Sequence, residues 1–300
     1  LAPADQLGLL YDSRALGEIG VVPMSDFLAL ARNAPATGEP VVLQTLSEQL
    51  DAIDWLFEGR PTQPAYRAFV ISRIAPIAER LGWDARPGEA DNDALLRRSV
   101  LVTLGDLGHA PTLAEARLRF DRYLADPGSL TGAGRRTVLS IVARNADAGT
   151  WEAIHKLARA SKDISDRARL YRLLGSAQNA ALADRALQLA LSGEPTPTEA
   201  PGIIASVAGA HPEKAYDFAI ANRAKVEALL EPTSRTSYFA EIAMASRTSA
   251  MLDKLTRYAA TVPPTARGEI DKSLSAIRFR LGVIGERVPE MERWLAGNAR

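Results

Sequence analysis

The residues best suited to catalysis are few and far apart in this 300-residue chain. It contains three histidines, His109, His155 and His211, and no cysteine. A zinc peptidase helix carries two histidines four residues apart with a glutamate between them, and that spacing is absent here. The lack of cysteine also excludes disulfides, cysteine-ligated zinc and thiol nucleophiles. We therefore expect no catalytic residue and no metal site in this chain.

Two weaker patterns have simpler interpretations. Glu152 and His155 stand at i and i+3, the spacing of ligand pairs in di-iron helix bundles, but such a site needs two pairs and further glutamates. The glycines between residues 128 and 134 follow a helical pattern and lack the lysine–serine/threonine ending of a phosphate loop. We interpret the first pattern as a surface interaction and the second as a flexible loop between helices.

The composition narrows the possible partners. Acidic and basic residues balance at 36 each, whereas a nucleic-acid-binding protein usually shows a basic excess or stripe. No apolar run approaches the roughly 18–20 residues of a membrane span. We expect no nucleic-acid partner and no membrane span. The composition does not choose between a cytoplasmic and a periplasmic location.

Apolar residues recur at the spacing of α-helices along most of the chain. In each stripe they fall near i, i+4, i+7 and i+11, which places them on one face of a helix. The clearest stripes are Leu46, Leu50, Ile53 and Phe57; Val70, Ile74, Ile77 and Leu81; Leu96, Val100, Leu104 and Leu107; and Leu113, Ala116, Phe120 and Leu124. Alternating strand patterns are absent, so we predict roughly fifteen helices.

Capping and breaking residues divide these helices. Thr112 with Glu115 predicts a capping box, and Ser25 and Thr150 are further N-cap candidates. Breakers occur at residues 126–128, 193–195 and 263–264. Their spacing predicts helix pairs of about 30–40 residues, typical of helical repeats. We predict an all-α fold, a superhelix of stacked antiparallel helix pairs resembling HEAT or armadillo arrays, forming a single domain over residues 1–300.

A collinear series of short segments resembles the C-terminal domain of the aminopeptidase N family. The first is the leucine-rich segment 5–16, followed by a turn between Gly17 and Gly20. The later segments are Gly82-Trp83, Leu95-Leu96-Arg97, residues 104–108, 116–120, Trp151-Glu152, 182–187 and 270–295. Asn179-Ala180 stands where the family has Asp-Pro. The resemblance covers nearly the whole chain.

This resemblance implies a function for the chain as part of a larger protein. Family members are zinc metalloaminopeptidases whose metal lies in a separate upstream catalytic domain, and the C-terminal helical domain caps that site and forms a chamber for the tail of the peptide. The resemblance therefore implies a noncatalytic domain with two partners, the peptide substrate and the upstream catalytic domain. Zinc would be the cofactor of that catalytic domain. The chain begins at Leu1 rather than Met, so we expect it to be part of a longer protein.

Arginines are the best candidates for contact with a peptide. The planar guanidinium matches a carboxylate in a bidentate manner, and we predict substrate-binding roles for Arg97, Arg247, Arg278 and Arg280 on helices. A salt bridge within the fold is the alternative for each of them. The alternative function for the whole chain is a free-standing α-solenoid scaffold that binds protein partners on a concave face.

Overall fold

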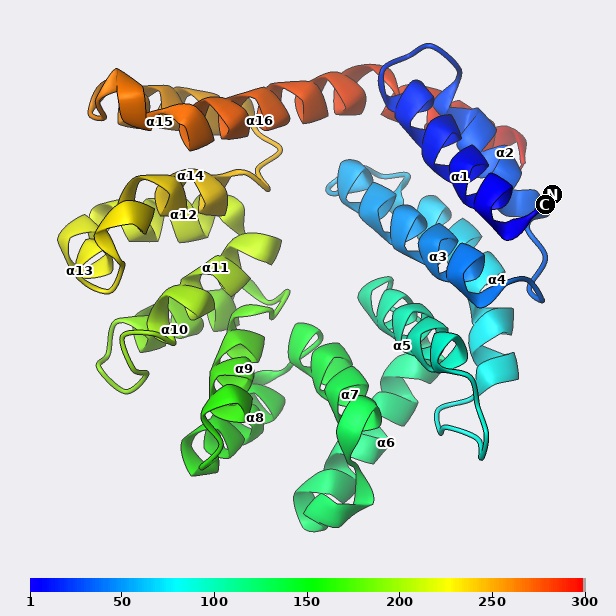
Figure 1. Ribbon diagram of the computed structural model, residues 1–300, viewed down its shortest axis with the longest axis horizontal. Helices are drawn as coiled ribbons and strands as arrows, with labels where there is room; N and C mark the ends of the chain where they lie inside the picture. The colour runs from blue at the N-terminus through cyan, green and yellow to red at the C-terminus, as the bar shows by residue number, and fades with distance from the viewer. Residues whose placement is uncertain (299–300) are drawn as a thin grey trace. The chain divides into compact units, whose positions relative to one another are not determined.

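The computed structural model describes residues 1–298 of the chain, and the regular secondary structure in that range is entirely helical (Figure 1). The chain forms two compact units, one made of Leu1–Ile141 with the described residues from Gly282 onward, the other of Val142–Leu281. The predicted all-α fold is confirmed. The expectation of one continuous domain remains a prediction.

In the first unit, helices contact both the next helix along the chain and the one after it. Here α3 packs on α1, α4 and α5, α1 packs on α2, and α17 returns to α2 and α4. The helices are α1 (Pro3–Glu18), α2 (Met24–Asn33), α3 (Pro40–Asp54), α4 (Gln63–Leu81), α5 (Asp91–Asp106), α6 (Ala110–Ala125), most of α7 (Gly132–Arg144) and α17 (Val288–Gly297), with the short 3-10 helices η1 (Trp55–Phe57) and η2 (Pro127–Ser129).

The second unit follows the same scheme. Here α9 packs on α8, α10 and α11, and α12 packs on α11 and α14. The helices are α8 (Ala148–Ala160), α9 (Ile164–Gly175), α10 (Ala180–Ala190), α11 (Ala200–Ala210), α12 (Pro212–Ala221), α13 (Arg223–Ala228), α14 (Arg235–Ala243), α15 (Ser249–Ala260) and most of α16 (Gly268–Glu286), with 3-10 helices η3 (Pro232–Ser234) and η4 (Pro264–Ala266).

The apolar stripes form the cores of these packed helices. All four residues of each stripe on α3–η1, α4 and α5–Leu107 are buried, whereas Leu124 at the end of the α6 stripe is 42 % exposed. Phe57 stacks on Tyr66 with ring centroids 4.6 Å apart, and the Tyr66 hydroxyl donates to the Leu50 carbonyl at 2.7 Å. Leu113, at the start of the same stripe, is half-buried. Helical periodicity thus identified the buried faces correctly, except at the two ends of the α6 stripe.

The three predicted caps are wrong, each for a local reason. Helix α6 begins at Ala110, before Thr112, because a proline at the second position needs no N–H partner there. Asp147 caps α8, its carboxylate accepting from the Thr150 amide at 2.7 Å. Helix α2 begins at Met24, so Ser25 already lies in its first turn.

Candidate functional site

Arg97 is buried on α5 and its guanidinium is engaged within the fold. Its Nε donates to the Gly82 carbonyl at 3.1 Å and its Nη2 to the Leu81 carbonyl at 3.3 Å. Both nitrogens of its fork bond to Glu89, one at 2.6 Å. The last carbonyls of a helix lack partners within that helix, so Arg97 completes the end of α4. The Arg97 hydrogen bond holds the pKa of the Glu89 carboxyl below its ordinary value.

A cavity of about 410 Å³ with a mixed polar and apolar lining lies beside Arg97 in the first unit. Arg98, Arg119, Trp83 and the glycine-rich start of α7 also line it. Arg119 donates two bonds to Asp84, at 2.7 and 2.8 Å, and one to Glu115 at 2.7 Å. These donors lower the pKa of Asp84. Most charges around the cavity are paired within the chain. The glycine-rich segment is largely helical rather than the flexible loop predicted from the sequence, since Gly128 lies in η2 and Gly132 and Gly134 lie in α7.

The other three predicted arginines belong to the second unit. Arg278 and Arg280 lie on α16, and Arg247 lies in the loop between α14 and α15; the expectation that Arg247 is on a helix is wrong. Arg280 donates from Nη1 to the carbonyls of Met244 and Ser246, both at 2.7 Å.

Burial and the nearby charge of Arg247 lower the pKa of Arg280. The structure therefore brings two of the four arginines near each other, at the loop that follows α14. Arg278 is exposed on α16. Peptide binding by all four residues remains a prediction.

A buried histidine cluster was missed by sequence reasoning. His155 Nε2 lies 2.5 Å from a carboxylate oxygen of Glu194, and the Tyr171 hydroxyl donates to the same oxygen at 3.0 Å. Burial opposes ionisation of Glu194, but the two hydrogen bonds outweigh it and its pKa lies below the ordinary value. Burial, together with this bond, raises the pKa of Tyr171 to about 12.

This cluster fastens the connection between α10 and α11 to α8 and α9. The predicted partner of His155, Glu152, is 3.9 Å from Nδ1 at its closest oxygen, and it instead pairs with Arg185. Glu194 lies 39 residues from His155, so no local spacing could have indicated the contact.

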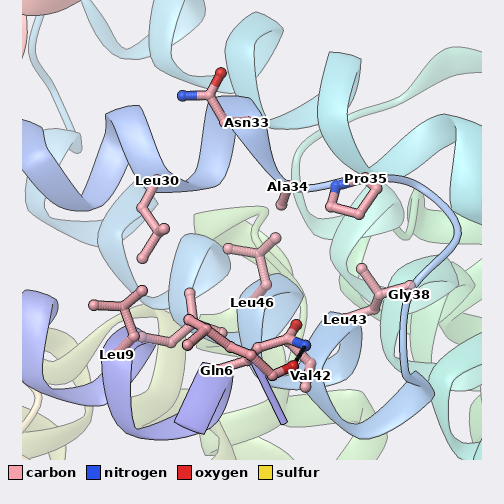
Figure 2. A pocket seen from close by; sticks show the side chains of 12 residues that line it. Gln6, Leu9, Leu30, Asn33, Ala34, Pro35, Gly38, Val42, Leu43 and Leu46 are labelled. Carbon is pink, nitrogen blue, oxygen red and sulfur yellow. Dashed lines mark hydrogen bonds between the residues drawn. The ribbon is translucent and has the colours of Figure 1, made fainter. Parts of the chain in front are cut away.

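An open apolar cavity of about 270 Å³ lies between α1, α2 and α3 (Figure 2). Leu9, Leu30 and Leu46 project into it from the three helices, and Gln6 and Asn33 are its polar lining residues. The Gln6 amide donates to the Leu1 carbonyl at 2.9 Å. The lining can accept an apolar side chain and offers no acid, base or nucleophile pair.

Residues 1–298 offer neither a metal-binding cluster nor a membrane-spanning helix. Within them no group of three or more histidine, aspartate or glutamate side chains is arranged to hold a metal ion. In the same range, every helix is too short or too polar to cross a membrane.

Comparison with known families identifies the family of this helical domain. A family model described as "ERAP1-like C-terminal domain" matches residues 1–279. The chain belongs to the ERAP1-like C-terminal domain family. The resemblance to the C-terminal domain of aminopeptidase N-like proteins is thereby confirmed.

Curated relatives of this ERAP1-like domain carry the names of aminopeptidases. Aminopeptidase M1-A of Oryza sativa subsp. japonica is 28% identical over 202 residues, 65% of this chain and 23% of the relative. Aminopeptidase M1 of Arabidopsis thaliana is 28% identical over 208 residues, with the same two shares. The alanine/arginine aminopeptidase of Saccharomyces cerevisiae is 24% identical over 198 residues, 64% of this chain and 23% of the relative. The chain thus spans about a quarter of the length of these relatives.

Proposed function

We propose that this chain is the noncatalytic helical part of a zinc metalloaminopeptidase that removes N-terminal residues from peptides. The family match over residues 1–279 carries this proposal, and the aminopeptidase names of the relatives support it. Zinc and the catalytic groups would belong to another part of the longer polypeptide. The described part of this chain contributes helices and charged side chains but no metal-holding group.

The role within that enzyme is to cap the catalytic site and to hold the tail of the peptide substrate. A peptide ends in a carboxylate, which is recognised best by arginine forks and by backbone N–H groups. Arg280 and Arg247 are the strongest candidates because they lie near each other at the loop after α14, and the hydrogen bonds of Arg280 among the described residues use its Nη1 alone, which leaves the other nitrogens of the fork for a carboxylate. Arg97 is the weakest, because its donors are occupied by Glu89 and two carbonyls.

Hydrolysis of a chromogenic amino-acid amide tests the proposal. The longer polypeptide should release the chromophore, a chelator should abolish the reaction, and zinc should restore it. The 300-residue chain alone should be silent with or without zinc. Chelator-sensitive turnover by this chain would refute the noncatalytic assignment, and a silent longer polypeptide loaded with zinc would refute the aminopeptidase assignment.

The capping role needs a separate measurement on the longer polypeptide. Arg280→Gln should raise the KM for peptides of several residues while leaving the KM for an amino-acid amide unchanged, because only the longer substrate reaches beyond the catalytic centre. Arg278→Gln, an exposed neighbour on the same helix, reports the effect of removing a positive charge without removing the half-buried guanidinium of Arg280.

A further inference from the structure

The open cavity between α1, α2 and α3 has small residues along one of its sides (Figure 2). Ala34, Pro35 and Gly38, in the connection between α2 and α3, line this side. Leu43 and Leu46 of α3 also line the cavity and are each only 2% exposed, so they form its deepest part. A concave apolar surface that solvent can reach is the usual form of a small-molecule binding site.

Among the described residues that line this cavity, none has an ionisable side chain. The twelve residues are leucine, valine, alanine, proline, glycine, one glutamine and one asparagine. An ionised group loses its hydration when it enters apolar surroundings, and only an opposite charge with good hydrogen bonds compensates for that loss. The lining therefore favours an uncharged ligand over an ionised one.

Gln6 presents an unpaired hydrogen-bond acceptor to this cavity. Its amide nitrogen donates to the Leu1 carbonyl at 2.9 Å, and no described residue donates to its oxygen Oε1. In Figure 2 this oxygen lies on the side of Leu46. Asn33 differs, because its amide nitrogen bonds back to the Ala29 carbonyl of its own helix at 2.8 Å and its side chain points away from the leucines. Since covering a polar atom without a hydrogen bond costs free energy, a ligand that covers Oε1 of Gln6 needs a donor.

The volume of the cavity limits the size of the ligand. It measures about 270 Å³, whereas an apolar protein cavity of about 150 Å³ is large enough to bind benzene. In proportion, this cavity holds about ten non-hydrogen atoms. A folded partner or a long peptide is much larger, so the ligand that fits inside is a compact molecule of one or two rings, or a short branched chain.

We propose that this cavity binds a small uncharged hydrophobe that carries one N–H or O–H donor, with the donor bonded to Oε1 of Gln6. The apolar body of the ligand lies against Leu9, Leu30 and Leu46, which project into the cavity from the three helices. All the lining residues belong to the first unit, and the site does not depend on the proposed function.

Titration of the 300-residue chain with indole and with indene, followed by saturation-transfer NMR, tests this site. The two probes share one fused-ring shape, but indole has an N–H where indene has a methylene group. We expect indole to bind with a Kd of about 0.1–1 mM, which is ordinary for so small a ligand. Indene should bind roughly three- to tenfold more weakly, because it covers Oε1 of Gln6 without donating to it. Equal affinities would overturn the proposal.

Two amide substitutions separate the role of Gln6 from a general effect on folding. Gln6→Met keeps the length of the side chain and removes the acceptor, so indole and indene should then bind equally well. Asn33→Met is the matched control, since the Asn33 amide bonds to its own helix, and it should retain the preference for indole. A preference for indole that survives Gln6→Met would contradict the proposed hydrogen bond.

Filling the cavity locates the binding site. Ala34→Phe puts a ring into the cavity and should weaken indole binding at least about tenfold, because a packed interior leaves no room for both. Ala36→Phe, in the same connection but outside the lining, should leave binding unchanged, and circular dichroism checks that both variants fold.

Two further outcomes would overturn the proposal. Indole binding that Ala34→Phe does not weaken would lie elsewhere on the chain. Binding by the 300-residue chain that is lost in the longer polypeptide would show that another segment fills the cavity.

Discussion

Replacing Arg97 by leucine separates a structural role from a substrate-binding role. The Arg97 and Glu89 side chains are 7% and 9% exposed, so the pair is almost fully removed from water. Removing one partner of a buried ion pair costs about 3–5 kcal/mol, because the remaining charge is left without compensation. The carbonyls of Leu81 and Gly82 lose their donor as well.

We expect Arg97→Leu to lower the free energy of unfolding by about 3 kcal/mol. For a unit of this size, that corresponds to a fall in Tm of roughly 6–12 °C. Urea denaturation followed by circular dichroism measures the change. Arg278→Leu is the matched control, since Arg278 is exposed and has no hydrogen bond among the described residues. It should shift the unfolding free energy by less than about 0.5 kcal/mol.

The double variant Arg97→Leu with Glu89→Leu tests whether the unpaired Glu89 carboxylate causes the loss of stability. If the loss in the single variant comes from a stranded carboxylate, removing that carboxylate should recover part of the lost stability. The reasoning would be refuted if Arg97→Leu unfolded like the wild-type chain and instead raised the KM for peptides in the longer polypeptide. That result would assign the residue to the substrate.

Two further predictions concern packing and pH. Gly175→Ala should lower the free energy of unfolding by about 1–3 kcal/mol, because the added methyl carbon would lie 2.6 Å from the Ile203 carbonyl oxygen. Gly209→Ala, which has open space around it, should raise the free energy of unfolding by about 0.4–1 kcal/mol. Urea denaturation of both variants measures these changes. The Glu292 carboxylate accepts from Arg60 at 2.8 Å and from Thr62 at 2.6 Å, which lowers its pKa. The stability that this carboxylate contributes is therefore present above the ordinary glutamate pKa and is lost as the pH falls through the lower folded pKa. Glu292→Gln should be less stable than wild type at pH about 7, and the difference should shrink as the pH is lowered; a difference that does not change with pH would contradict this.

Local patterns predicted the helices well, since a helix is formed by residues close in sequence. The stripe from Val70 to Leu81 is buried throughout, because the same periodicity that makes one face apolar also decides which face packs. Trp151 on α8 is likewise 1% exposed, and its indole N–H donates to the Leu174 carbonyl at 3.0 Å.

Side-chain partners were predicted less well, since they depend on residues far apart in sequence. The pairing of His155 with Glu194 required the connection after α10 to fold back on α8. The sequence identified Arg97 as notable, but the nearby Glu89 that occupies it has no distinguishing pattern. A residue type and a helical position suggested which arginines could bind a carboxylate, whereas only the folded chain shows which carboxylate is nearest.

The first unit includes residues beyond the part of the chain that the family model matches. The match ends at residue 279, yet α17 supplies groups that α2 and α4 use. The carboxylate of Glu290 accepts from the Met24 and Ser25 amides at 3.1 and 2.8 Å, at a helix start that has no side-chain cap of its own.

Trp294 meets Phe69 on α4 edge to face, with ring centroids 5.5 Å apart. A carboxylate at a helix N-terminus and an aromatic pair are each worth about 0.5–1.5 kcal/mol. Because these contacts join residues more than two hundred positions apart, the first unit is completed only when the end of the chain returns to it.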